Sequence, residues 1–129
     1  LSKCASGGEL SRIMLVIKGL MAQYVGMPTM IFDEIDAGVS GSVADKMGRK
    51  IVEMGRHMQI FAITHLPQVA SKGSAHYLVY KTIEEGDEPR TQIKYIEGDE
   101  RVREIARMLS GSKLTEEALA NARVLLQSE

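Results

Sequence analysis

Apolar residues recur every three or four positions in four stretches of the chain, and this spacing predicts four helices. The first stretch begins at Leu10 and ends before Gly26 and Pro28, and we expect its apolar residues to form one buried stripe. These residues are Ile13, Met14, Ile17, Leu20, Met21 and Tyr24. The second stretch contains Val43, Met47, Ile51 and Met54. Either Ser40 or Ser42 can cap this second helix, which is expected to end near residues 55–57.

Short apolar runs between turn signals predict the strands. Residues 29–33 and 59–64 have the composition expected of strands that are buried on both faces. Residues 75–83 and 91–96 predict a hairpin with a polar tip over residues 84–90. Pro67 suits the first turn of a short helix that runs to about Ser71. The last two helices contain Val102, Ile105, Ala106 and Leu109, closed by Gly111, and then Ala118, Leu119, Ala122, Leu125 and Leu126.

The order of these elements is helix, strand, helix, strand, helix, hairpin, helix, helix. Strands that alternate with helices are typical of an α/β fold with a parallel core. A chain of 129 residues is long enough to bury its own core, so we expect a single domain over residues 1–129.

Composition and charge exclude several classes of protein. Sixteen Lys and Arg against 17 Asp and Glu leave a net charge of −1, without the basic excess typical of an autonomous nucleic-acid binder. The apolar runs are far shorter than the roughly 20 residues of a membrane-spanning helix, and no signal-peptide pattern occurs, so we expect a cytosolic protein. The single Cys4 excludes an internal disulfide. The start at Leu1 indicates a piece of a longer protein.

The first candidate site is Ser6-Gly7-Gly8-Glu9, directly before the first helix. Free N–H groups and the positive end of a helix dipole favour an anion such as a phosphate at this place. Ser6 and Glu9 also have the spacing of a capping box, which needs no ligand. Both readings stay open, and they can coexist.

The second candidate site lies where two predicted strands end. Asp33 and Glu34 follow an apolar run, and in α/β sheets ligands bind at the carboxyl ends of strands. Because side chains alternate along a strand, one acid can serve a magnesium ion while the other addresses a water. His65 follows the next strand directly and can donate to a phosphate. Alternatively, the acids simply mark the exit into solvent, Asp36 belongs to an ordinary polar loop, and the histidine is structural.

Together, these motifs resemble the ATPase heads of ABC-type proteins. Residues 6–12 resemble the signature motif, residues 30–34 the Walker B strand, residues 35–40 the D-loop, and His65 the switch histidine. The stretches SGGELSR, IFDEIDAGVSG, ITHLPQVAS and EIARMLSG are most similar to a bacterial DNA-repair branch of the SMC (structural maintenance of chromosomes) relatives. The resemblance covers most of the chain, and only the hairpin region adds little to it.

The resemblance implies the C-terminal lobe of an ABC/SMC-type ATPase head, with a parallel-core sheet, flanking helices and a β-hairpin. It implies ATP and Mg²⁺ as cofactors, and ATP hydrolysis coupled to the repair and recombination of DNA double-strand breaks. By the family pattern, two heads form a homodimer with two nucleotides held between them. DNA would be bound through the intact protein, in the cytoplasm and on the nucleoid.

The family's roles transfer to individual residues of this sequence. Asp33 would hold the magnesium ion, Glu34 would polarise the attacking water, and His65 would contact the γ-phosphate. Residues 6–9 would grip the nucleotide bound by the opposite head, and Asp36 would lie at the interface between the heads.

One family motif is missing, because no G-x-x-x-x-G-K-[ST] loop occurs in the 129 residues. We therefore expect the phosphate-binding Walker A strand in an N-terminal half of the head, and no ATP hydrolysis by this chain alone. The strand at residues 59–64 should then have an open, apolar edge through which the chain can dimerise or aggregate.

Two alternatives belong to other functional classes. The chain can be a non-enzymatic α/β module for protein interaction or dimerisation, in which the acids and the histidine are structural. A receiver-like phosphoacceptor domain that uses Asp33 fits less well, because the lysine it requires at the end of a later strand is missing and Lys81 is poorly placed.

Overall fold

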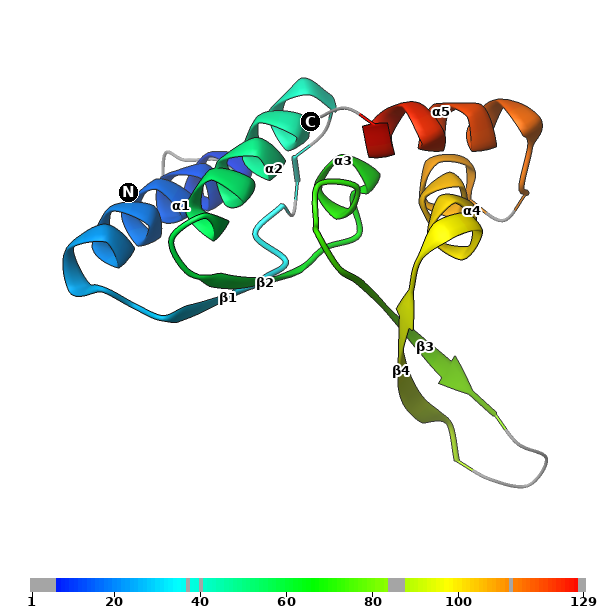
Figure 1. Cartoon of the computed structure of the whole chain (residues 1–129), viewed down its shortest axis with the longest axis horizontal. Coiled ribbons are helices and arrows are strands. Elements are labelled where there is room, and N and C mark those ends of the chain that lie inside the picture. Colours follow the sequence, from blue (N-terminus) through cyan, green and yellow to red (C-terminus); the bar gives the residue numbers. More distant parts are fainter. Residues whose placement is uncertain (1–6, 37, 40, 84–87, 112, 128–129) are drawn as a thin grey trace. The chain divides into compact units, whose positions relative to one another are not determined.

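The computed structural model describes residues 7–36, 38–39, 41–83, 88–111 and 113–127 (Figure 1). These residues form two compact units that meet in sequence at Lys72 and Gly73. Unit 1 contains α1 (Gly7–Val25), β1 (Thr29–Asp33), α2 (Gly41–Gly55), β2 (Gln59–Ile63) and α3 (Pro67–Ala70). Unit 2 contains β3 (His76–Thr82), β4 (Arg90–Ile96), α4 (Gly98–Ser110) and α5 (Glu116–Gln127). The single domain expected from the chain length stays a prediction.

Every predicted helix and strand occurs, in the predicted order. The proline at the first turn of α3 and the glycine after α4 also have the predicted places, and Gly111 has the left-handed φ of 75° that favours glycine there. One helix cap is wrong, because α2 already begins at Gly41 and Ser42 therefore lies inside the helix. The other proposed cap, Ser40, lies outside the described residues.

The sheet of unit 1 pairs β1 with β2 in parallel, from Thr29 opposite Gln59 to Asp33 opposite Ile63. Figure 1 shows α1 and α2 over the same face of the two strands. On that face Met30 and Phe32 are buried, whereas Ile31, Phe61 and Ile63 on the other face are 60%, 45% and 54% exposed. The predicted burial of both faces is therefore wrong for the part of the chain that the structure describes. An apolar run shows that a face can be covered, but not which segment covers it.

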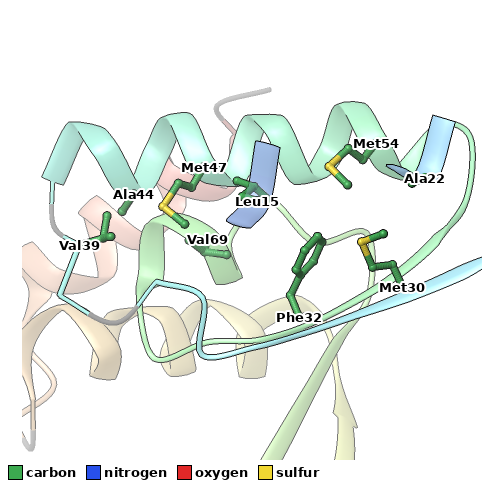
Figure 2. Packing of buried hydrophobic residues seen from close by; sticks show 9 residues of the cluster. All are labelled: Leu15, Ala22, Met30, Phe32, Val39, Ala44, Met47, Met54 and Val69. Carbon is green, nitrogen blue, oxygen red and sulfur yellow. The ribbon is translucent and has the colours of Figure 1, made fainter. Parts of the chain in front are cut away.

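The core of unit 1 lies between the helices and the inner face of the strands. Figure 2 shows this cluster, which contains Leu15, Ala22, Met30, Phe32, Val39, Ala44, Met47, Met54 and Val69. Phe32 is fully buried in it, and the ammonium group of Lys18 lies 5.5 Å from the centre of its ring. This distance is within the range of a cation–π contact, so Phe32 joins β1 to α1 by both packing and charge.

The buried side of α1 differs from the predicted stripe. Of the six apolar residues of that stripe, all are more than 40% exposed, and Tyr24 is 89% exposed. The helix instead packs through Leu15, Gly19 and Ala22, where a Cβ on Gly19 would lie 3.3 Å from the sulfur of Met54. Because α1 carries apolar residues on most of its circumference, periodicity could not decide which side faces this core, and small residues allowed the closer approach.

The short helix α3, which follows the candidate histidine, is held against α2. Gly48 has no side chain where α3 approaches, since a Cβ there would lie 3.1 Å from the carbonyl oxygen of Gln68. Next to it, the buried ammonium group of Lys72 lies 3.5 Å from the carboxyl of Asp45. A hydrogen bond from Arg49, together with the charges of Arg49 and Lys72, holds the pKa of Asp45 below its usual value. These contacts fix the segment that begins just after His65.

Unit 2 is an antiparallel hairpin with two helices. Strands β3 and β4 pair from His76 opposite Ile96 to Thr82 opposite Arg90, and the rings of Tyr77 and Tyr95 lie 5.5 Å apart on one face. The small core of this unit consists of Ile96, Ile105, Ala106, Ala118 and Ala122. The predicted hairpin is thus confirmed, while most of the predicted tip lies outside the described residues.

Acid is expected to destabilise unit 2 through His76. Its imidazole is half-buried, and burial, helped by the charge of Arg101, holds its pKa below the ordinary 6.5. The unfolded chain therefore takes up the proton more readily than the folded one. The stability that the neutral imidazole of His76 contributes is complete above pH 6.5, and it is lost as the pH falls through the pKa of the folded state. The effect is measured as the free energy of unfolding of unit 2 in urea between pH 5 and 8, followed through the amide signals of β3 and β4.

Two variants test whether His76 causes this loss of stability in acid. His76→Gln is expected to flatten the acid side of the stability profile, whereas His57→Gln, which changes an exposed residue of unit 1, should leave it intact. An unchanged profile in His76→Gln would show that other groups cause the loss.

Candidate functional site

The candidate site is built where β1 and β2 end. The parallel register sets Asp33 opposite Ile63, so the residues that follow the two strands leave the sheet at the same edge. The backbone N–H of Glu34 donates to the carbonyl of Ile63 over 3.1 Å, which extends the pairing by one residue. Asp33, Glu34 and His65 thus come together at one edge, as the sequence predicts.

Glu34 has an unusual backbone. Its φ is +48°, and no other non-glycine residue that the structure describes has a positive φ. A side chain in this left-handed region costs about 1–3 kcal/mol, and such strain is concentrated at functional sites. The strand already ends at Asp33, so the alternation of side chains that predicted opposite directions for the two acids does not extend to Glu34. Its direction is set by the turn instead.

The carboxyl group of Asp36 is buried, with a side-chain exposure of 1%. The hydroxyl of Thr64 donates to its Oδ2 and accepts a 3.0 Å hydrogen bond from the N–H of Leu66. The loop after β1 is therefore joined to the loop after β2 through one side-chain pair. The interface role predicted for Asp36 stays a prediction, and its side chain points into unit 1.

His65 lies beside this pair and remains open to solvent. Its Nδ1 is 3.9 Å from Oδ1 of Asp36, and its side chain is 63% exposed. Asp33 and Glu34 are also exposed. The edge therefore presents two acids and an imidazole to solvent, above a buried carboxyl and a hydroxyl that hold the loops.

The glycine motif is only partly described. Gly7 and Gly8 form the start of α1, where backbone N–H groups lack partners within the helix, and Glu9 is exposed in the first turn. Ser6 lies outside the described residues, so the capping box with Glu9 stays a prediction. The glycines are at the place in the fold where an anion site would need them.

The acids of this edge do not form a complete metal site in the described part of the chain. No group of three or more His, Cys, Asp or Glu residues there is placed to hold a metal ion. Asp33 is exposed at the end of its strand and fits the role of a single carboxylate ligand. A magnesium ion at Asp33 would therefore need further ligands beyond the described acids of this edge.

Sequence reasoning missed the role of Thr64 and the burial of Asp36. In the sequence Thr64 is only the last residue of the strand predicted at residues 59–64, and a threonine there carries no signal of its own. An acid in a polar loop is usually exposed. The one clue is that Asp36 comes shortly after one predicted strand and Thr64 ends the next, and parallel strands end at the same edge of a sheet.

No helix in the described part of the chain is both long and apolar enough to cross a membrane.

Comparison with known proteins identifies relatives that match nearly the whole chain. No protein-family model matches the chain. The chain is 45% identical over 128 residues to the DNA repair protein RecN of Streptomyces coelicolor, and 44% identical over 126 residues to that of Vibrio cholerae. It is 46% identical over 127 residues to RecN of Xylella fastidiosa. These matches cover 98–99% of this chain but only 22–23% of the relatives.

A solved structure has a similar fold. It comes from work on ATP-driven dimerization and DNA-stimulated activation of SMC ATPases, and it matches 86% of this chain and 65% of its own with a TM-score of 0.65. The sequence identity is 16%, so this likeness concerns the fold. The predicted α/β fold of an SMC-type ATPase head is confirmed. Over nearly its whole length the chain is therefore similar to one part of the DNA repair proteins named RecN, the branch to which its motifs pointed, and it spans less than a quarter of the length of these relatives.

Proposed function

We propose that this chain supplies one half of an ATP-hydrolysing head in a protein that repairs DNA double-strand breaks by recombination. The observation that carries the proposal is Glu34, held in a left-handed conformation directly after Asp33 at the carboxyl edge of the parallel pair. A strained acid, an exposed carboxylate that can bind a metal ion, and an imidazole are suited to phosphoryl transfer. This reaction depends on positioning and on stabilisation of charge.

The proposed roles follow the chemistry of that edge. Asp33 contributes a ligand to Mg²⁺, Glu34 polarises the attacking water, and His65 meets the γ-phosphate. ATP and Mg²⁺ supply the transferred group and the charge that neutralises it. These residues lie on adjacent loops that two hydrogen bonds, from Glu34 and Thr64, hold together.

The remaining motifs serve a second head. Residues 6–9, at and before the start of α1, grip the nucleotide of the opposite head in a homodimer. The loop at residues 35–40 lies at the interface, and since the carboxyl of Asp36 is buried, other atoms of this loop make the contacts. DNA is bound by the intact protein on the bacterial nucleoid in the cytoplasm.

The test is to mix this chain with an N-terminal fragment of a RecN protein that carries the phosphate-binding loop. We expect steady ATP turnover from the mixture and none from either part alone, because the Walker A lysine and the acids lie on different parts. Turnover by this chain alone would contradict the proposed division. No turnover from a folded and associated mixture would contradict the ATPase itself.

A second candidate function is supported by the outer face of β1 and β2. Ile31, Phe61 and Ile63 form an exposed apolar surface there, which is typical of a protein-interaction or dimerisation module. In the described residues, β2 pairs only with β1, as the expected open edge requires. Glu34→Gln discriminates the two functions, because it should leave an interaction unchanged but stop an ATPase.

A further inference from the structure

The carboxyl group of Asp36 is the only acid of the candidate site that lies inside unit 1. Its Oδ2 is bonded by the Thr64 hydroxyl, whereas Oδ1 is equally buried and has no hydrogen-bond partner among the described residues. A buried carboxyl oxygen without a donor is unfavourable, and such an atom needs an explanation.

The imidazole of His65 lies near this oxygen and can supply a donor. Its Nδ1 lies 3.9 Å from Oδ1, which is longer than the roughly 2.7–3.2 Å of an N–H···O hydrogen bond. The ring is 63% exposed, so solvent rather than packing surrounds most of it. A shift of about 1 Å would bring Nδ1–H into hydrogen-bond range of Oδ1.

We propose that Asp36 is a positioning residue for His65, holding Thr64 through Oδ2 and accepting the Nδ1–H of the imidazole at Oδ1. The imidazole of His65 then has two positions. In the docked position Nδ1–H is bonded to Oδ1 of Asp36, and in the open position of this structure the two atoms are 3.9 Å apart. In the docked position Nδ1 carries the proton and Nε2 is presented at the edge where Asp33 and Glu34 end. Asp36 thereby couples the loop after β1 to the group that follows β2.

Thr64 links Asp36 to the segment that follows His65 through its hydrogen bonds. Its single proton is donated to Oδ2 of Asp36, and its oxygen accepts the N–H of Leu66. The carbonyl of Leu66 in turn accepts the N–H groups of Val69 and Ala70, the last two residues of α3. The position of His65 is thus tied on one side to the acid loop and on the other to a helix.

The test reads the tautomer of His65 by long-range ¹H–¹⁵N NMR on this chain without nucleotide, observed on the neutral ring. The chain has three histidines, and the signal is assigned by its loss in His65→Gln. We expect the Nδ1–H tautomer to dominate in the native chain. Asp36→Asn has nearly the same shape, and when its oxygen accepts from Thr64 its NH₂ group faces His65, so the Nε2–H tautomer should replace it.

The control is Asp45→Asn, which removes the same charge from a carboxyl of α2 that pairs with Arg49 and Lys72. It should leave the tautomer of His65 unchanged. An Nε2–H tautomer of His65 in the native chain would overturn the proposal even if Asp36→Asn did not fold. The same tautomer in the native chain and Asp36→Asn would also overturn it.

A kinetic consequence rests on the proposed ATPase function. In the reconstituted mixture, Asp36→Asn should lower kcat about tenfold and leave KM nearly unchanged, because positioning and not nucleotide binding is lost. Equal effects on kcat from Asp36→Asn and Asp45→Asn would contradict a positioning role in turnover. If the native mixture shows no turnover, the ATPase proposal fails, while the NMR experiment still decides the contact between Asp36 and His65.

Discussion

Glu34→Gln in the reconstituted head is expected to lower ATP turnover by about 10²–10⁴-fold. A glutamine has the same size and keeps the strained backbone, but it cannot take up a proton from the attacking water. Nucleotide binding should persist, because Asp33 and the phosphate-binding loop are unchanged. The measurement is phosphate release under single-turnover conditions, with retained nucleotide followed in parallel.

The matched control is Glu53→Gln, which removes one negative charge from an exposed residue of α2 that pairs with Lys50. Turnover should be unchanged in this variant. If both variants lost turnover equally, net charge and not water activation would be the cause. If Glu34→Gln remained active, Glu34 would be structural and the interaction module would be favoured.

The elements of the fold could be predicted because local signals agree with them. Gly26 and Pro28 end α1, Pro67 begins α3, and Gly111 follows α4. Proline fixes φ, and glycine tolerates the positive φ found at Gly26 and Gly111, so both act without regard to distant parts of the chain. The predicted and observed bounds of the helices and strands therefore differ by only a few residues.

Burial was predicted less well, because it depends on what covers a surface. The apolar run at residues 29–33 has Met30 and Phe32 on the covered face and Ile31 on the exposed one. Nothing in five residues distinguishes a face covered by helices of this chain from a face left for another segment. The same reason explains why the apolar stripe of α1 was assigned to the wrong side.

The candidate site shows a similar division. Asp33, Glu34 and His65 could be predicted at one edge because parallel strands end together. The left-handed φ of Glu34 and the buried pair of Asp36 and Thr64 could not, since no glycine marks the turn and the pair is 28 residues apart in sequence. Turn conformation and side-chain pairing across loops depend on tertiary structure.

Phe32→Ala is expected to destabilise unit 1 by about 3–5 kcal/mol. The ring is fully buried, contacts the core between α1, α2 and the strands, and receives the ammonium group of Lys18, so its removal leaves a cavity and a cation without its partner. Such a loss is comparable to the whole stability of a small unit. Amide exchange of Glu34, which reports on the pairing of β1 with β2, should then accelerate by more than about a hundredfold.

Ile31→Ala is the matched control, since this residue is adjacent in the same strand but 60% exposed on the opposite face. In the chain alone it should change stability by less than about 1 kcal/mol, because little apolar area is buried there. In the mixture with the N-terminal fragment it should weaken association if that face is covered in the assembled head. Equal destabilisation of the isolated chain by both variants would contradict the one-sided sheet. If the outer face is uncovered in the isolated chain, Phe32 contributes to the stability of unit 1, whereas Ile31 contributes only to association.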